Sequence, residues 1–474
     1  MTMALPLTRT EHDPLGAHEV PASAYWGVHT ARALTNFPIS GTPVGTHREL
    51  VAALGAVKLA AARANHELGL LDDRRYDAIA AAAHDVRAGA LDDQFVVDVI
   101  QGGAGTSTNM NANEVIANRA LELLGLPRGS YDELHPLDHV NRCQSTNDVY
   151  PTAVRLALLA AMARMAEATA ALADAFAAKS VEFRTVPKIG RTQLQDAVPM
   201  TVGQELGAYA VTLREELARL EDAQGLLCEI NLGATAIGTG ITAHPDYRRR
   251  AVRHLADLTG QPLVSAGDLV EATSDTGAFV QASSVLKRIV VKASKICNDL
   301  RLLSSGPQAG FGELQLPARQ AGSSIMPGKV NPVIPEMVNQ VAFWVIGNDV
   351  TVTMAAEGGQ LQLNAFEPVI CHSLLQGFAW TAAAFDALRE LCVDGITVDA
   401  ARLALVAAGN AGLATALTPL LGYALSAEIA KAALGGAGDV RTLALATGGL
   451  DADVLDALLR PETLANLDPQ ANGG

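Results

Sequence analysis

The chain of 474 residues contains few aromatic residues and less positive than negative charge. Phe, Trp and Tyr make up 4% of it, and 35 Lys and Arg stand against 50 Asp and Glu, which gives a formal net charge of −15 at pH 7. Nucleic acids and anionic membranes attract positively charged proteins, so we expect neither as a partner. A small anionic substrate is not excluded, because it responds to the local field of its site.

Cysteine is also scarce, and long uninterrupted apolar runs are missing. The five cysteines are scattered and none belongs to a C-x-x-C pair: Cys143, Cys228, Cys297, Cys371 and Cys392. This argues against a zinc site and a disulfide framework, and it fits a reducing compartment. Polar or helix-breaking residues interrupt the apolar stretches 333–354 and 403–427, and residues 1–16 lack the apolar core of a signal peptide. We expect a cytoplasmic protein without a membrane span.

Alanine and leucine dominate the 49% of the chain that is hydrophobic, and both residues favour helices over strands. Apolar faces predict helices over 50–70 and 76–88, then longer ones over 151–184, 198–227, 278–303 and 332–356. Long helices with small side chains bury little alone, so they imply a bundle. The sequence predicts an all-α fold with a mixed helical domain at 1–142, a central long-helix bundle at 143–396 and a small helical domain at 397–474.

The segment Gly322-Ser323-Ser324-Ile325-Met326-Pro327-Gly328-Lys329-Val330-Asn331-Pro332 is the most informative one. It combines two glycines, two adjacent hydroxyls, one cation and one amide. Glycine permits close backbone approach, and the polar side chains would suit an anionic substrate. Asn331 and Pro332 are typical of an N-cap and the first position of a helix. We therefore expect a loop that leads directly into a helix and serves catalysis on a carboxylate.

Three other segments share this pattern of hydroxyls and amides before an expected helix. They are 102–109, 144–148 before a helix that begins near Pro151, and 190–196 before a helix that contains Pro199. Helix N-termini carry unpaired N–H groups and a partial positive charge, and bind carboxylates without a cationic side chain. One such cluster is usually a helix cap. Four clusters, each richer in oxygens than a cap requires, favour binding.

Two further motifs predict less. The glycine-rich run 233–240 lacks the lysine of a phosphate-binding loop and lies in a helical context, which argues against a nucleotide. His135 and His139 are four residues apart, but Pro136 between them favours a structural role over a metal site.

At the segment 322–331 the chain resembles the aspartase/fumarase superfamily, whose signature loop reads G-S-S-x-M-P-x-K-x-N. The resemblance extends from about Glu19 to about Lys431. It is strongest to the members that release ammonia from L-aspartate, over 27–30, 36–37, 101–118, 144–155, 190–199, 231–240, 359–364 and 367–368. Class II fumarases are similar but usually carry histidine at the position of Gln193.

This resemblance implies a reaction and a set of roles. Ammonia leaves L-aspartate reversibly by anti elimination, through an aci-carboxylate intermediate, and fumarate forms. Ser323 is implied as the general base. The other implied roles are contacts to the α-carboxylate by Thr192, Lys329 and Asn331, to the β-carboxylate by Thr106, Ser145, Thr146 and Ser324, and to the amino group by Asn147 and Gln193.

The resemblance also implies a three-domain helical subunit, a homotetramer with active sites shared by three subunits, and a loop that closes over the substrate. No organic cofactor is implied, because the carboxylate of the substrate accepts the electron pair. Some relatives respond to divalent cations, but we find no ligand cluster that predicts this here.

Three departures from the family bear on substrate choice. Gln193 cannot titrate, which favours loss of ammonium over loss of hydroxide. Leu137 stands where relatives often have asparagine, and Cys143 where they usually have serine. The alternatives are a class II fumarase acting on fumarate and L-malate, a lyase for a substituted aspartate or another amine, and a catalytically silent helical oligomer. The joint presence of Ser323 and Lys329 with their polar partners argues against the last.

Overall fold

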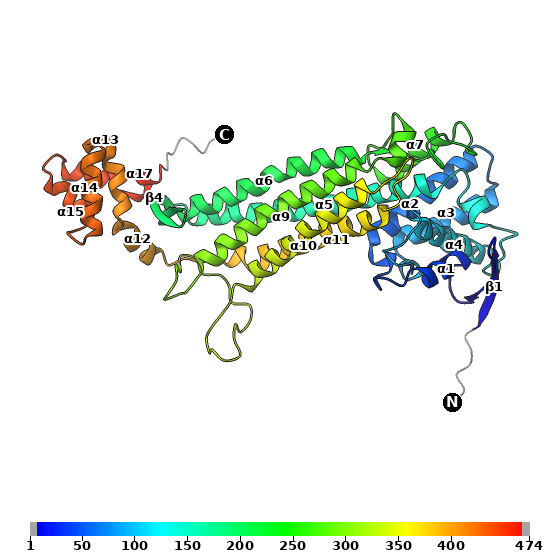
Figure 1. The fold of residues 1–474 in the computed structure, drawn as a ribbon, viewed down its shortest axis with the longest axis horizontal. Coiled ribbons are helices and arrows are strands. Elements are labelled where there is room, and N and C mark those ends of the chain that lie inside the picture. The colour runs from blue at the N-terminus through cyan, green and yellow to red at the C-terminus, as the bar shows by residue number, and fades with distance from the viewer. Residues whose placement is uncertain (1–6, 467–474) are drawn as a thin grey trace. The chain divides into compact units, whose positions relative to one another are not determined.

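The computed structural model describes residues 7–466 and is predominantly helical (Figure 1). The strands form three two-stranded sheets, of which β1–β2 and β3–β4 are antiparallel and β5–β6 is parallel. This confirms the all-α prediction. The tetramer stays a prediction.

Contacts between residues divide the chain into two compact units. The first comprises the chain up to Ala166, Ala218–Val290 and Val341–Ala382, and the second comprises Glu167–Leu217, Val291–Gln340 and the chain from Ala383 onward. Five long helices have residues in both units: α5 (Thr146–Glu182), α6 (Val202–Leu227), α9 (Gly277–Leu303), α10 (Val333–Glu357) and α11 (Glu367–Leu391). The division into three domains at 142 and 396 stays a prediction.

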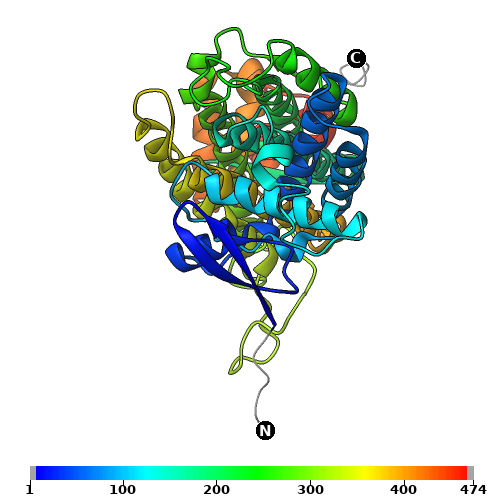
Figure 2. The same ribbon diagram turned by 90° about the vertical axis from the view of Figure 1, so that its right-hand side faces the viewer.

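The first unit is built around α2 (Arg48–Glu67), which is buried along most of its length and contacts α3 (Asp73–Ala88) and α7 (Tyr247–Thr259). A side chain on Gly55 would come within 2.9 Å of the backbone nitrogen of Arg87, so glycine permits the close approach of α2 and α3. The hairpin of β1 (Thr8–Asp13) and β2 (Gly16–Pro21) contacts α1 (Val28–Asn36) and is blue in Figure 2. The remaining elements of this unit are α4 (Thr106–Leu123), α8 (Leu269–Ser274), β5 (Glu229–Ile230), β6 (Val264–Ser265), the 3₁₀-helices Val44–Thr46 and Asp92–Gln94, and the π-helix Pro136–Val140.

The second unit carries the C-terminal helices, whose core gathers Leu413, Leu417, Ile429 and Leu455. These elements are short, as the glycine-rich sequence predicts. They are α12 (Ala400–Ala408), α13 (Thr418–Leu421), α14 (Tyr423–Leu434), α15 (Val440–Ala446), α16 (Ala452–Leu458), α17 (Pro461–Leu464) and the 3₁₀-helices Val393–Gly395 and Ala411–Leu417.

Buried polar side chains join the long helices within each unit. In the first unit, the Ser283 hydroxyl on α9 donates to the Asp349 carboxylate on α10 at 2.8 Å. In the second unit, the Asn339 amide on α10 donates to the Ser294 hydroxyl on α9, also at 2.8 Å. Such buried pairs fix the register of neighbouring helices because an unpaired polar group would be costly. The long helices of the sequence analysis are thus present, with ends displaced by a few residues.

The prediction that a helix contains Pro199 is wrong. Residues 187–201 form a hairpin of β3 (Pro187–Thr192) and β4 (Gln195–Thr201), and α6 begins at Val202. The turn residues Gln193 and Leu194 have φ of +51° and +63°, the left-handed pair that a two-residue hairpin turn needs. The sequence did not reveal this hairpin, because its turn lacks the glycine or asparagine that usually marks one.

Two helix starts also differ from expectation. Helix α5 begins at Thr146, so Pro151 lies inside it rather than at its start. Proline has no N–H for the carbonyl four residues earlier, and this carbonyl, on Asn147, instead accepts a hydrogen bond from the Asn231 amide at 3.0 Å. Helix α10 begins at Val333, and the side-chain oxygen of Asn331 accepts from Lys329.

Helix α5 is long and apolar enough to cross a membrane, and the bent pair Ala400–Ala408 and Ala411–Leu421 passes the same test together. In α5, 56% of the most apolar window of 18 residues is buried inside the protein, as is common for the core helix of a folded domain.

We expect Gly105→Ala to lower the thermal stability of the protein far more than Gly125→Ala. Both glycines have positive φ, of +86° and +73°, so both variants strain the backbone. An added Cβ at Gly105 would lie 2.4 Å from the buried Tyr150 ring, whereas nothing lies within 4 Å at Gly125. Overpacking should cost about 1–3 kcal/mol beyond the shared strain. Equal melting temperatures for the two variants would contradict this packing.

Candidate functional site

The predicted site residues lie in both units. The first unit holds Thr106, Ser145, Thr146 and Asn147, and the second holds Thr192, Gln193, Ser323, Ser324, Lys329 and Asn331. Each group has its own geometry.

Thr106 is the first residue of α4 and follows a turn of left-handed residues. Gly103, Ala104 and Gly105 have φ of +92°, +54° and +86°. The exposed Thr106 hydroxyl donates to the Gly103 carbonyl at 2.6 Å. Its oxygen therefore lies at a helix N-terminus, where the partial positive charge suits an anionic ligand.

Ser145, Thr146 and Asn147 form the entrance to α5. The Ser145 hydroxyl oxygen accepts from the Asn147 backbone N–H at 3.3 Å, and the Thr146 oxygen accepts from the Asn109 amide at 3.0 Å. Because Asn109 belongs to α4, this bond connects the entrance of α5 to the helix that carries Thr106. Each hydroxyl oxygen is held as an acceptor, which leaves its proton for a ligand.

Two buried ionisable side chains that the sequence analysis did not single out, Asp148 and Lys58, adjoin this entrance. Asp148 accepts from the backbone N–H groups of Ser145 (2.9 Å), Gly233 (2.9 Å) and Thr235 (3.1 Å). Burial raises its pKa to about 6, although these donors and the charge of Lys58 oppose the shift. A carboxylate that satisfies three amides is a fixed anchor for the loop.

Lys58 is fully buried and donates to the side-chain oxygens of Asn141 and Gln144, both at 2.9 Å. Burial lowers its pKa from an ordinary 10.5 to about 7, and the charge of Asp148 opposes this. The Asn141 oxygen also accepts from Asn109 at 3.3 Å, so Lys58 connects to the residue that holds Thr146. The signal for Lys58 in the sequence is a lone lysine within the apolar stretch 50–62, a position where a charge requires partners.

In the second unit, Ser323 lies in a loop that closes on itself. The Gly322 N–H donates to the Lys329 carbonyl at 2.8 Å, and the Asn331 amide donates to the Gly322 carbonyl at 3.0 Å. A side chain on Gly322 would lie 2.5 Å from the Lys329 carbonyl oxygen, so glycine is required for this closure. The Lys329 ammonium donates to the Asn331 side-chain oxygen at 2.7 Å. This places the positive charge beside Asn331, the residue predicted to contact the α-carboxylate of the substrate.

The Ser323 hydroxyl oxygen accepts from two backbone N–H groups, those of Ile325 at 3.2 Å and Met326 at 3.0 Å. Donors aimed at an oxygen stabilise its deprotonated form. Ser324 is exposed next to it, and Thr192 and Gln193 are exposed at the turn between β3 and β4.

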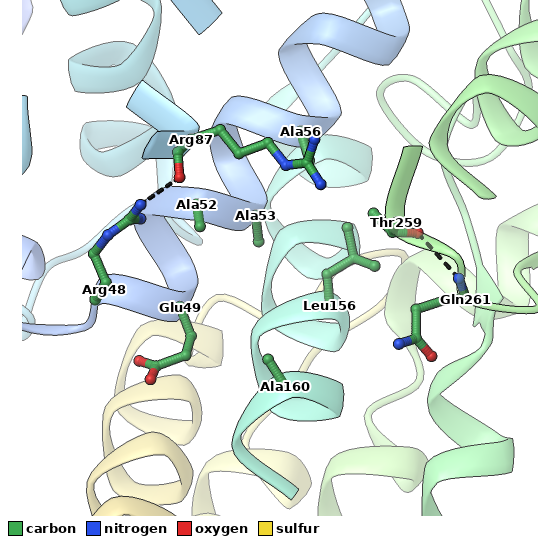
Figure 3. A pocket seen from close by; sticks show the side chains of 10 residues that line it. All are labelled: Arg48, Glu49, Ala52, Ala53, Ala56, Arg87, Leu156, Ala160, Thr259 and Gln261. Carbon is green, nitrogen blue, oxygen red and sulfur yellow. Dashed lines mark hydrogen bonds between the residues drawn. The ribbon is translucent and has the colours of Figure 1, made fainter. Parts of the chain in front are cut away.

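The cavities of the structure differ in their relation to these residues. One of about 390 Å³ in the first unit is lined by Arg48, Glu49, Arg87, Thr259, Gln261 and several alanines, and contains none of the predicted site residues (Figure 3). Its arginines already bind protein groups, since Arg48 donates to the Arg87 carbonyl and Arg87 to the Leu258 carbonyl. A cavity of about 220 Å³ in the second unit is lined in part by Val330, Asn331 and Pro332.

Within residues 7–466, no group of three or more His, Cys, Asp or Glu side chains could hold a metal ion. His135 instead accepts from the backbone N–H groups of Leu137 and Asp138, at 3.1 Å and 3.3 Å, in the π-helix Pro136–Val140.

Comparison with known proteins gives consistent results. Residues 16–347 match a family described as lyase, and residues 413–466 match one described as the fumarase C C-terminus. The chain is 57% identical to an aspartate ammonia-lyase of Pseudomonas fluorescens and 50% identical to one of Escherichia coli strain K12, each over 96% of both chains.

Two solved structures are similar over almost the whole chain. A Brucella melitensis protein described as fumarate lyase:delta crystallin, bound to cobalt, has a TM-score of 0.94 and 57% identity, over 97% of this chain and all of the other. A class II fumarase of Schistosoma mansoni has a TM-score of 0.91 and 34% identity, over 97% of this chain and 99% of the other.

The replacement Lys58→Met should remove a pH dependence of stability. Because the pKa of Lys58 is about 7 in the folded protein and near 10.5 when unfolded, the unfolded chain binds more protons between these values. The free energy of unfolding should therefore rise with pH in this window, by at most about 1.4 kcal/mol per pH unit. Melting temperatures at pH 7–10 measure this rise. The control Lys295→Met, at a lysine whose side chain is 67% exposed, should keep the slope, and a K58M variant that also keeps it would contradict the assignment.

Proposed function

Because this chain belongs to the aspartase/fumarase superfamily of lyases, we propose that it eliminates ammonia reversibly from L-aspartate to give fumarate. One observation carries this proposal: the curated aspartate ammonia-lyases are 50–57% identical over nearly the full chain, whereas the matched class II fumarase is 34% identical. Gln193 agrees with it, since an ammonium group departs without the acid that hydroxide needs.

We propose Ser323 as the base that takes the proton from the carbon beside the β-carboxylate. A serine hydroxyl is a weak acid, so its anion needs stabilisation. The N–H groups of Ile325 and Met326 point at the oxygen in question, and Lys329 adds a positive charge within the same loop.

The carbanion formed in this step is stable only as an aci-carboxylate, which carries two negative charges on the carboxyl oxygens. We propose Thr106, Ser145, Thr146 and Ser324 as its donors. Their hydroxyls are neutral. Those of Ser145 and Thr146 accept hydrogen bonds from protein donors and keep their protons for the substrate, whereas the Thr106 hydroxyl turns from the Gly103 carbonyl to the substrate. Thr192, Lys329 and Asn331 hold the α-carboxylate in this scheme, and Asn147 and Gln193 face the amino group. Ammonia leaves from the face opposite Ser323, and the substrate carboxylate serves as electron sink in place of a cofactor.

We propose that subunits complete one another in a homotetramer, with each site drawn from three subunits. Helix α10 supports association, because it exposes large apolar side chains at Phe343 (62%), Val350 (58%) and Met354 (69%). Spacings of seven and four residues put them on one helix face, which a partner helix would cover. We further propose that the protein works in the cytoplasm, without a nucleic-acid or membrane partner.

Incubation of the protein with L-aspartate should produce fumarate, followed by its ultraviolet absorbance. The same measurement with L-malate should give little or none, because Gln193 supplies no proton to a leaving hydroxide. Fumarate from malate and none from aspartate would replace this proposal with a fumarase. The same assay with substituted aspartates shows which other amines the protein releases.

Loss of the base should abolish turnover without loss of the fold. Ser323→Ala removes the hydroxyl, and we expect kcat to fall by about 10³-fold or more, in the upper part of the range usual for general acid–base groups, because Ser323 begins the reaction. Circular dichroism and size-exclusion chromatography should match the unchanged protein. Ser274→Ala provides a matched control, since the Ser274 hydroxyl donates to carbonyls of its own helix, those of Val270 and Glu271. Activity of S323A near that of the control would exclude Ser323 as the base.

A further inference from the structure

An ion network in the second unit joins three segments that the proposed mechanism does not use. Lys188 on β3 pairs with Glu205 on α6 at 2.5 Å and with Glu313 at 2.7 Å. Arg191, also on β3, pairs with the other oxygen of Glu313 at 2.5 Å. The side chains of Lys188 and Glu313 are 2% and 7% exposed, so these charges are largely removed from water. Removal of one partner would leave a buried charge uncompensated.

Both cations reach one carboxylate although they are three positions apart in a strand. Side chains at such spacing point to opposite faces of a regular strand. The pairing of β3 with β4 shifts register between Ile189 and Arg191, and a bulge of this kind increases the local twist. The twist accounts for the convergence of Lys188 and Arg191 on Glu313. The Arg191 guanidinium also lies 4.3 Å from the centre of the Phe311 ring.

Glu313 is a firmly held partner. Its backbone N–H donates to the Leu303 carbonyl at 2.8 Å, which fixes it to the end of α9, and Gln315 exchanges two backbone hydrogen bonds with Thr397. The turn that follows Arg191, by contrast, exposes Thr192 and Gln193 to solvent. On the β3 side, the ion network is therefore the link to the rest of the unit that lies nearest in sequence to the turn.

We infer that Glu313 is a positioning residue, which sets the β3–β4 turn, and so Thr192 and Gln193, for the α-carboxylate and amino group of the substrate. The inference rests on the proposed function. Glu313 precedes the loop 322–332 by nine residues, so one carboxylate fixes the turn to the segment that leads into the Ser323 loop. It acts through Lys188 and Arg191 and does not touch the substrate.

The isosteric variant Glu313→Gln tests this in the full chain with L-aspartate. We expect kcat/KM to fall by roughly 10–100-fold, the effect of a displacement near 1 Å. The fall should appear mainly in KM, because the α-carboxylate is bound alike in the ground and transition states. Inhibition by fumarate should weaken in parallel. Glu313→Asp keeps the charge and should recover part of the loss.

Three comparisons separate positioning from general destabilisation. Asp174→Asn removes an exposed pair with Arg214 by the same change of charge and should leave KM unchanged. Leu455→Ala lowers stability in the C-terminal core at α16 and should leave KM unchanged at equal loss of melting temperature. If E313Q does not fold, Arg191→Met leaves the Lys188–Glu313 pair intact and should raise KM by itself.

A folded E313Q protein with unchanged KM and kcat would overturn the inference, and so would an equal rise of KM in L455A at matched stability. Failure of the unchanged protein to release fumarate from aspartate would instead refute the proposed function, which keeps the two failures distinct.

Discussion

The buried carboxylate of Asp148 is the constraint on which the first unit's part of the candidate site depends. It binds backbone N–H groups from two segments far apart in sequence, around Ser145 and around Gly233 to Thr235. A carboxylate removed from water requires such partners, and the charge of the buried Lys58 also favours its ionised form. The loop that carries Ser145 and Thr146 is therefore anchored through the Asp148 carboxylate.

The candidate site is built mainly from neutral donors. Hydroxyls and amides at Thr106, Thr146 and Asn331 occupy helix entrances or a closed loop, where backbone carbonyls and a neighbouring side-chain amide orient them. Preorganised donors stabilise a doubly negative intermediate at less cost than several cations, which would also bind the starting carboxylates tightly. The electric field at a helix N-terminus is locally positive, although the whole chain carries a net charge of −15. The negative net charge therefore does not prevent binding of a substrate with two carboxylates.

Much of the fold could be predicted from the sequence, and the failures have physical causes. The helix periods and the alanine content identified α2, α3, α9 and α10, because apolar faces must be buried wherever a helix lies. The β3–β4 hairpin was missed because its turn relies on left-handed φ at Gln193 and Leu194, which no local signal marks. The start of α5 was misplaced since the partner of the Asn147 carbonyl, Asn231, is distant in sequence. For the same reason Lys58 went unrecognised: its partners come from the tertiary fold.

The predicted site residues were named from motifs, and the motifs could not show that these residues are divided between two units.

Pro151 shows how a defect in one helix becomes a link between segments. Proline usually weakens a helix because one carbonyl loses its donor. Here that carbonyl, on Asn147, accepts a hydrogen bond from the side-chain amide of Asn231, 84 positions away. The first turn of α5 thus exchanges an internal bond for a cross-link, and the Asn147 backbone cannot fray without breaking it. A residue that normally loosens helical order here ties the end of the helix to a distant segment of the chain, and the rigidity of a predicted site residue, Asn147, depends on a proline that is not itself a predicted site residue.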